Sequence, residues 1–161
     1  MNQLNHEDYY RGWVLGFLFS EDLRRVVLIQ KTHPNWWPGK LNGISGKIPP
    51  GSSHRATIWN KSKEELGYDY DNWQYLKSFS TNKPNHNVHV FYGVGDISKC
   101  ITMNTNEPLF FSSIEIIRRC WFANSPLGVV AGLIEECIES LENILVPTTD
   151  IKYKNITMEQ K

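Results

Sequence analysis

The chain has 161 residues, 40% hydrophobic and 21% charged, which is enough to bury the core of one domain without disulfide bonds. Its 17 basic residues balance its 17 acidic residues, which excludes a strong overall field drawing it to nucleic acid or an anionic membrane. Its 3 cysteines form no CxxC pair and its first residues are polar, so we expect a cytoplasmic protein with reduced thiols and no membrane partner.

The chain opens with a predicted hairpin. Residues 10–20 and 25–31 are rich in Val, Leu and Phe on either side of the polar turn 21–24, as two core strands would be. The following segment, THPNWWPGKLNG, contains proline, glycine and two adjacent tryptophans. Loops with that many aromatic residues often line a pocket, so we expect a long loop there.

A helix is predicted next, because Pro49-Pro50-Gly51 indicates a turn and a serine follows it. Either Ser52 or Ser53 is a suitable N-terminal cap. The helix is expected to end near Leu66, since Gly67 stands where a left-handed C-terminal cap is usual.

The second half of the chain alternates between strands and helices. We predict strands at 73–80, 87–95 and 109–111, and helices at 114–119 and 127–144. Ser125 would cap the last helix, with Pro126 as its first helical residue. This order predicts an α+β protein built as an α/β/α sandwich, a single domain over 1–161 with its core at about 8–145. The tail, 146–161, has no such pattern, and we expect its end to be loose.

Residues 46–68, GKIPPGSSHRATIWNKSKEELGY, have the spacing of the Nudix box, G-x5-E-x7-R-E-U-x-E-E-x-G-U, where U is a bulky aliphatic residue. Gly46, Glu64, Glu65 and Gly67 match the pattern, with Tyr68 at its last position. In addition, LNGISGKI and NHNVHVFYGVGD resemble two strands of MutT-like nucleotide hydrolases. From about residue 10 to 145 the chain therefore resembles the Nudix hydrolase superfamily, of the MutT-like type that removes damaged nucleoside triphosphates. This resemblance implies a Nudix fold with a mixed sheet.

Three charged positions of the box are replaced. Ser52 replaces a Glu and Asn60 replaces an Arg, two residues that form a salt bridge in the family. We expect a short hydrogen bond between the two neutral side chains to replace it. Lys61 replaces a third acidic residue, one helical turn before Glu65. We expect Lys61 to pair with Glu65, which would put a positive charge where the family gathers Mg²⁺.

Two interpretations of Lys61 compete. In the first, the lysine neutralises the site, and the protein binds phosphates without cleaving them. In the second, Glu64 and Glu65, together with Glu107 from outside the box, still hold Mg²⁺ or Mn²⁺. The resemblance then implies weak hydrolysis of a phosphoanhydride by metal-activated water, with Glu64 and Glu65 as catalytic residues. A third alternative leaves Lys61 as a solvated surface residue.

Ligand-binding candidates come from the resemblance and from residue chemistry. Asn42 stands where relatives use an asparagine to read a purine edge, although it equally suits a turn before Gly43. Gly46 and Lys47 border the expected phosphate region, and Asn124 falls where relatives place acidic base readers. Trp36 could stack on a base, but tryptophans also serve as core or lid residues.

The sequence thus supports three functions. The first is a MutT-like domain that binds a nucleoside di- or triphosphate or a related nucleotide, with hydrolysis lost or strongly reduced. The second is an active Mg²⁺-dependent nucleotide pyrophosphohydrolase. The third is a module that binds RNA or a protein partner through the Nudix cleft, although the zero net charge disfavours RNA. The sequence does not decide between a monomer and a homodimer.

Overall fold

The computed structural model describes residues 12–32, 40–81, 86–121 and 128–145. Seven strands, three α-helices and one short 3₁₀ helix lie in these ranges. In chain order they are β1 (Gly12–Ser20), β2 (Arg25–Lys31), β3 (Lys40–Asn42), β4 (Ile44–Lys47), α2 (His54–Leu66), β5 (Gln74–Ser80), β6 (Asn87–Gly95), η1 (Ile97–Lys99), β7 (Leu109–Ser113), α3 (Ile114–Trp121) and α4 (Gly128–Leu145).

The predicted hairpin is confirmed as the antiparallel pair β1 and β2. Its turn is held by Asp22, whose carboxylate accepts from the Ser20 hydroxyl at 2.6 Å and from the Arg24 N–H at 3.0 Å. A short acidic residue followed by a backbone N–H two positions on is the usual chemistry of such turns. Leu23 in this turn has a left-handed backbone, with φ of 57°.

β1 is the central strand of the mixed sheet. It runs parallel to β6 over its whole length, and antiparallel to β4 along its first half and to β2 near its end. β5 extends the sheet beyond β6, while β3 and β7 both pair with β2. Because β1 has neighbours on both edges and layers on both faces, nearly all of its residues are buried and apolar.

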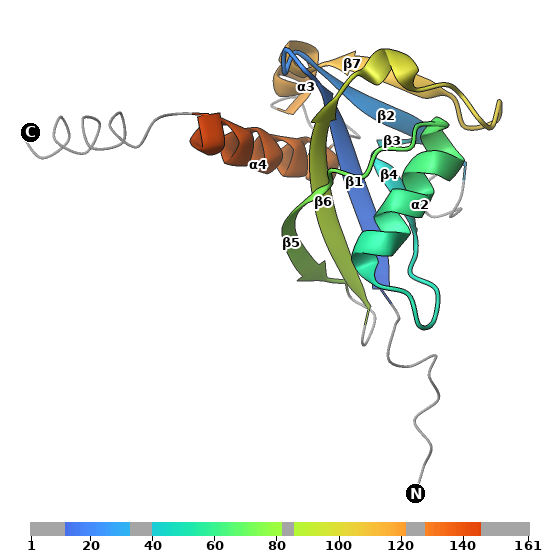
Figure 1. Cartoon of the computed structure of the whole chain (residues 1–161). Helices are drawn as coiled ribbons and strands as arrows, with labels where there is room; N and C mark the ends of the chain where they lie inside the picture. Colours follow the sequence, from blue (N-terminus) through green and yellow to red (C-terminus); the bar gives the residue numbers. More distant parts are fainter. Residues whose placement is uncertain (1–11, 33–39, 82–85, 122–127, 146–161) are drawn as a thin grey trace, which may run out of the picture.

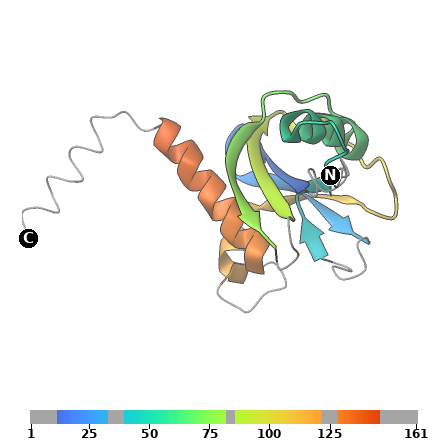
Figure 2. The same ribbon diagram turned by 90° about the horizontal axis from the view of Figure 1, so that it is seen from below.

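Two hydrophobic cores lie on opposite faces of this sheet. The core under α2 includes Val14, Val27, Ile29 and Ile58. The other core, formed with α3 and α4, includes Leu15, Leu28 and Ile134 among others. Alternate residues of β1 and β2 enter opposite cores, as the two-residue period of a strand requires. Figures 1 and 2 show α2 and α4 on opposite sides of the sheet, which confirms the α/β/α sandwich.

The boundaries of α2 confirm the predicted caps and settle the choice between the two serines. Ser53 is the N-cap, and its hydroxyl accepts from the Ala56 N–H at 3.0 Å. Gly67 ends the helix with φ of 61°, and its N–H donates to the Lys63 carbonyl. These caps fix where α2 begins and ends, at His54 and Leu66.

The last helix is also close to its prediction, since α4 spans Gly128–Leu145. Its buried residues, among them Val130, Leu133 and Cys137, face the sheet at helical spacing. The predicted cap, Ser125-Pro126, lies outside the described residues. No helix in the described part of the chain is long and apolar enough to span a membrane.

Candidate functional site

The box segment forms a strand, a turn and a helix that pack together. β4 supplies Gly46, and α2 lies across it with Lys61 facing the strand. A Cβ atom on Gly46 would lie only 2.2 Å from the Cε atom of Lys61 and 2.7 Å from its Cδ atom. The aliphatic stem of Lys61 therefore rests directly on the Gly46 backbone, and a side chain at position 46 would push it aside.

Lys61 pairs with Glu64 and not, as we predicted, with Glu65. Its Nζ atom donates to Glu64 Oε2 at 2.9 Å, one helical turn away. The Lys61 side chain is 28% exposed and that of Glu64 61% exposed, so a ligand in solvent can reach this ammonium group. The reason for the correction is that Glu65 already has another partner.

That partner is Lys31, the last residue of β2. Lys31 Nζ donates to Glu65 Oε1 at 2.5 Å, and the Ser45 N–H of β4 donates to Glu65 Oε2 at 3.2 Å. The Lys31 side chain is only 7% exposed and that of Glu65 18%. Both oxygens of Glu65 are therefore held by groups from two strands, in a pair largely closed to water.

Burial has the largest effect on the pKa of the Glu65 carboxyl. It raises the pKa of the Glu65 carboxyl above its ordinary value, while the Lys31 charge and hydrogen bond, the Ser45 N–H and the Lys61 charge each lower it. Desolvation disfavours a carboxylate in this way unless a cation lies beside it. Lys31 is therefore the group on which the charged form of Glu65 chiefly depends.

The expected hydrogen bond between Ser52 and Asn60 is not formed, since none joins these two described side chains. The Ser52 N–H donates to the Pro49 carbonyl at 3.1 Å, and Asn60 is exposed. A different bond holds the other end of the helix. Ser62, fully buried where the pattern has a bulky aliphatic residue, donates through its hydroxyl to the Tyr68 carbonyl at 2.7 Å. This bond ties the helix to the segment after it without an ion pair.

The other predicted ligand residues are only partly brought together. Asn42 ends β3, and its Oδ1 atom accepts from the Gly43 N–H at 2.9 Å, as a turn residue would. Lys47 is paired with Trp13 in the sheet and follows Gly46, so the strand period turns it away from α2. Trp36 and Asn124 lie outside the described residues.

Lys31 is the site residue that the sequence reading missed. A signal for it was nevertheless present. Val27, Ile29 and Lys31 alternate along β2, and the first two enter the core beneath α2. The two-residue period therefore puts a lysine on the buried face of the strand, where a charge needs a partner.

Solved structures show which fold this is. The Nudix domain of Shewanella oneidensis NrtR, complexed with ADP-ribose, is 16% identical, with a TM-score of 0.63 over 81% of this chain and 87% of that one. A MutT structure from work on Aliivibrio salmonicida and Vibrio cholerae is 15% identical, with a TM-score of 0.59 over 77% and 95%. DR0079 of Deinococcus radiodurans is 19% identical, with a TM-score of 0.60 over 85% and 90%. The chain has the Nudix fold. No protein-family model and no curated protein sequence matches it.

Nudix proteins are expected to hold a divalent metal at their box, but this donor set does not fit one. Glu64 is paired with Lys61, and Glu65 with Lys31. Glu107, the predicted ligand from outside the box, accepts from the Thr32 N–H at 3.1 Å and from the Thr32 hydroxyl at 3.2 Å. Among the described residues, no three His, Cys, Asp or Glu side chains are grouped so as to hold a metal ion.

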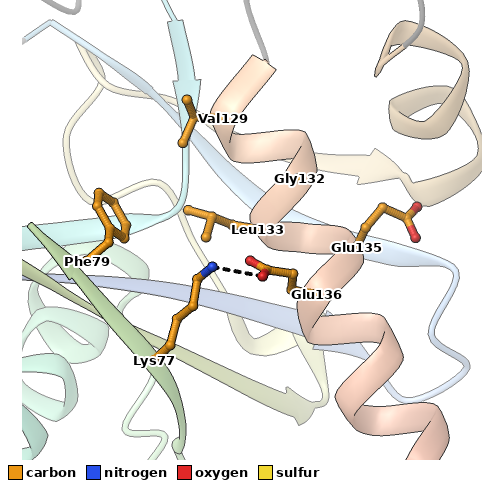
Figure 3. Close-up of a pocket in the computed structure, with 7 residues that line it drawn as sticks. All are labelled: Lys77, Phe79, Val129, Gly132, Leu133, Glu135 and Glu136. Atoms are coloured by element: carbon orange, nitrogen blue, oxygen red, sulfur yellow. Dashed lines mark hydrogen bonds and ion pairs between the residues drawn. The ribbon is translucent and has the colours of Figure 1, made fainter.

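A separate cavity of about 480 Å³ lies on the other side of the Nudix sheet, between β5 and α4 (Figure 3). Phe79, Val129 and Leu133 form its apolar lining. At its edge Lys77 donates to Glu136 at 2.8 Å. α2 covers the opposite face of the sheet, so this cavity is distinct from the box.

Proposed function

We propose that this Nudix-fold domain is MutT-like and binds a nucleoside di- or triphosphate or a related nucleotide, with hydrolysis lost or strongly reduced. The observation that carries the proposal is the position of Lys61. Its stem lies on Gly46, and its ammonium group is bonded to Glu64 while remaining partly exposed. A fixed cation therefore occupies the part of the box where hydrolytic relatives are expected to gather metal.

The chemistry of this site favours phosphate binding over metal binding. A lysine ammonium has three donors and no acceptor, so it binds phosphate oxygens and repels Mg²⁺. Lys61 uses one donor on Glu64, which leaves others for a ligand. The solved complex of the NrtR Nudix domain with ADP-ribose supports a nucleotide as the ligand class.

The experiment is to measure phosphate or pyrophosphate release and thermal stabilisation side by side. The panel comprises canonical and oxidised nucleoside triphosphates, ADP-ribose and dinucleoside polyphosphates, each with Mg²⁺ or Mn²⁺. We expect at least one compound to raise the melting temperature, with no release above the background of a Glu65→Gln variant. Release at ordinary enzymatic rates that is abolished by Glu65→Gln would instead establish an active hydrolase.

Lys61→Gln shows whether the stabilisation comes from the box. We expect this substitution to lower the affinity for the stabilising compound, because it keeps a polar side chain of similar length but removes the charge. Lys77→Gln, at an exposed ion pair on the far side of the sheet, is the matched control and should leave binding unchanged. Equal affinity in Lys61→Gln and wild type would place the ligand elsewhere.

A further inference from the structure

We propose that Lys31 is a built-in counter-ion that takes the electrostatic place of a divalent metal at Glu65, so that the site binds its phosphate ligand without a metal. The proposal deepens the function proposed above and rests on it for the identity of the ligand. The part of the proposal that concerns metal binding, the metal arm, involves only Lys31, Glu65 and their surroundings. It is therefore tested without any nucleotide.

The first support is where Lys31 comes from. It ends β2, opposite Lys40 of β3 in the sheet, and its Nζ atom reaches Glu65 in the last turn of α2. Its Nζ atom lies 2.5 Å from Glu65 Oε1, which is close to the distance of about 2.0–2.1 Å at which Mg²⁺ would bind that oxygen. The ammonium group already holds that oxygen, and its charge would repel a metal bound to the same carboxylate.

The second support is that both oxygens of Glu65 already accept a hydrogen bond. Its other carboxylate oxygen accepts the Ser45 N–H at 3.2 Å, and the side chain is 18% exposed. A metal would have to share this carboxylate with a buried ammonium group and a backbone donor, or displace one of them. Displacing Lys31 would leave its charge unpaired in a site from which it has little access to water.

The third support is the local charge. Lys31 neutralises Glu65, and Lys61 neutralises Glu64, each from a different side of the box. An approaching divalent cation therefore meets two carboxylates that are already compensated and two ammonium groups that repel it. The net charge of these four groups is zero, so a phosphate is bound here by hydrogen bonds from Lys61, which is partly exposed and keeps donors beyond the one it uses on Glu64.

The test measures Mn²⁺ binding by electron paramagnetic resonance, with no nucleotide present. Wild type is compared with Lys31→Met, which keeps the length of the side chain and removes its charge. Lys77→Met is the matched control, because it also removes a paired lysine but at a surface site beyond the sheet. We expect Lys31→Met to bind Mn²⁺ at a site that depends on Glu65 with an affinity at least about tenfold above any such binding in wild type or Lys77→Met.

Several results decide the metal arm. A micromolar Mn²⁺ site in wild type that Glu65→Gln abolishes would overturn the proposal, as would a folded Lys31→Met variant with no gain in affinity. If Lys31→Met is unfolded without metal, the proposal predicts that Mn²⁺ restores its fold, since the metal would then supply the missing charge. Failure of Mn²⁺ to restore it would also overturn the proposal.

The ligand arm is measured independently on wild type. A nucleotide that stabilises the protein is titrated in excess EDTA and again in excess Mg²⁺, and we expect the two affinities to agree within about threefold. Binding that requires Mg²⁺ would contradict the metal-free site. A panel in which nothing binds would refute the proposed function while leaving the Mn²⁺ result on Lys31 valid.

Discussion

Replacing Lys31 by methionine should destabilise the protein strongly at neutral pH and much less in mild acid. The substitution leaves the Glu65 carboxylate in a site where its side chain is only 18% exposed, without its cation. Removing one member of a buried pair typically costs about 3–5 kcal/mol. The cost is limited here because Glu65 can take up a proton instead of remaining charged.

The free energy of protonating Glu65 sets the upper limit of this cost. With the ordinary carboxyl pKa of 4.5, protonating Glu65 costs about 3.4 kcal/mol at pH 7 and about 0.7 kcal/mol at pH 5. Burial raises the pKa of Glu65 in the folded protein, so its folded state holds the proton more tightly than the unfolded chain does. The stability of the variant is therefore highest at low pH and falls as the pH rises through the folded pKa.

Urea denaturation in EDTA at the two pH values measures this effect. We expect Lys31→Met to lose about 3 kcal/mol relative to wild type at pH 7 and less than about 1 kcal/mol at pH 5. Lys77→Met, whose ion pair is 43% exposed on both sides, should lose only about 0.2–1 kcal/mol at either pH. A loss for Lys31→Met that is small at pH 7, or equal at both pH values, would refute a buried pair with Glu65.

Three further substitutions test the elements that position the box. The His54 and His89 rings stack with centroids 4.7 Å apart, and burial lowers the pKa of both from 6.5. The neutral rings therefore stabilise the fold above pH 6.5, and this stability should be lost as the pH falls below that value. His54→Phe should therefore lose less melting temperature than wild type between about pH 7.5 and pH 5.5, and an equal loss would exclude the ring pair as the cause. Ser53→Ala should cost about 1 kcal/mol in urea denaturation, because the N-cap of α2 is lost, and an unchanged midpoint would contradict the cap. Gly67→Ala should cost more than about 1 kcal/mol, because φ is 61° there and the new Cβ would lie 2.8 Å from Ile101 Cγ1; a neutral result in the same assay would argue against the left-handed cap.

Most of the fold could be predicted from short-range patterns. The hairpin, α2 and β6 follow from hydrophobic alternation, turn residues and caps, each of which depends on residues near one another in the sequence. The strands β3 and β4, at 40–42 and 44–47, were not predicted as separate strands within the long loop and the segment LNGISGKI. They are short, and their pairing with β2 and β1 is set by residues distant in the sequence.

The candidate site was less predictable, for a related reason. The box fixes which residues α2 carries, but the partner of Glu65 comes from β2, 34 residues earlier in the chain. Helical spacing alone allowed Lys61 to reach either Glu64 or Glu65, and the presence of Lys31 decides the choice. The expected Ser52–Asn60 bond is not formed, since the Ser52 N–H bonds to the Pro49 carbonyl and the Asn60 side chain is exposed.

The most direct test of the central claim is calorimetric titration of wild type with ADP-ribose and with the nucleoside triphosphates, in EDTA and in Mg²⁺, with product analysis after each titration. The site described here predicts that one of these compounds binds with similar affinity in both buffers and is recovered intact. Binding seen only with Mg²⁺, followed by release of phosphate or a nucleoside monophosphate, would contradict a lysine-based, metal-free site.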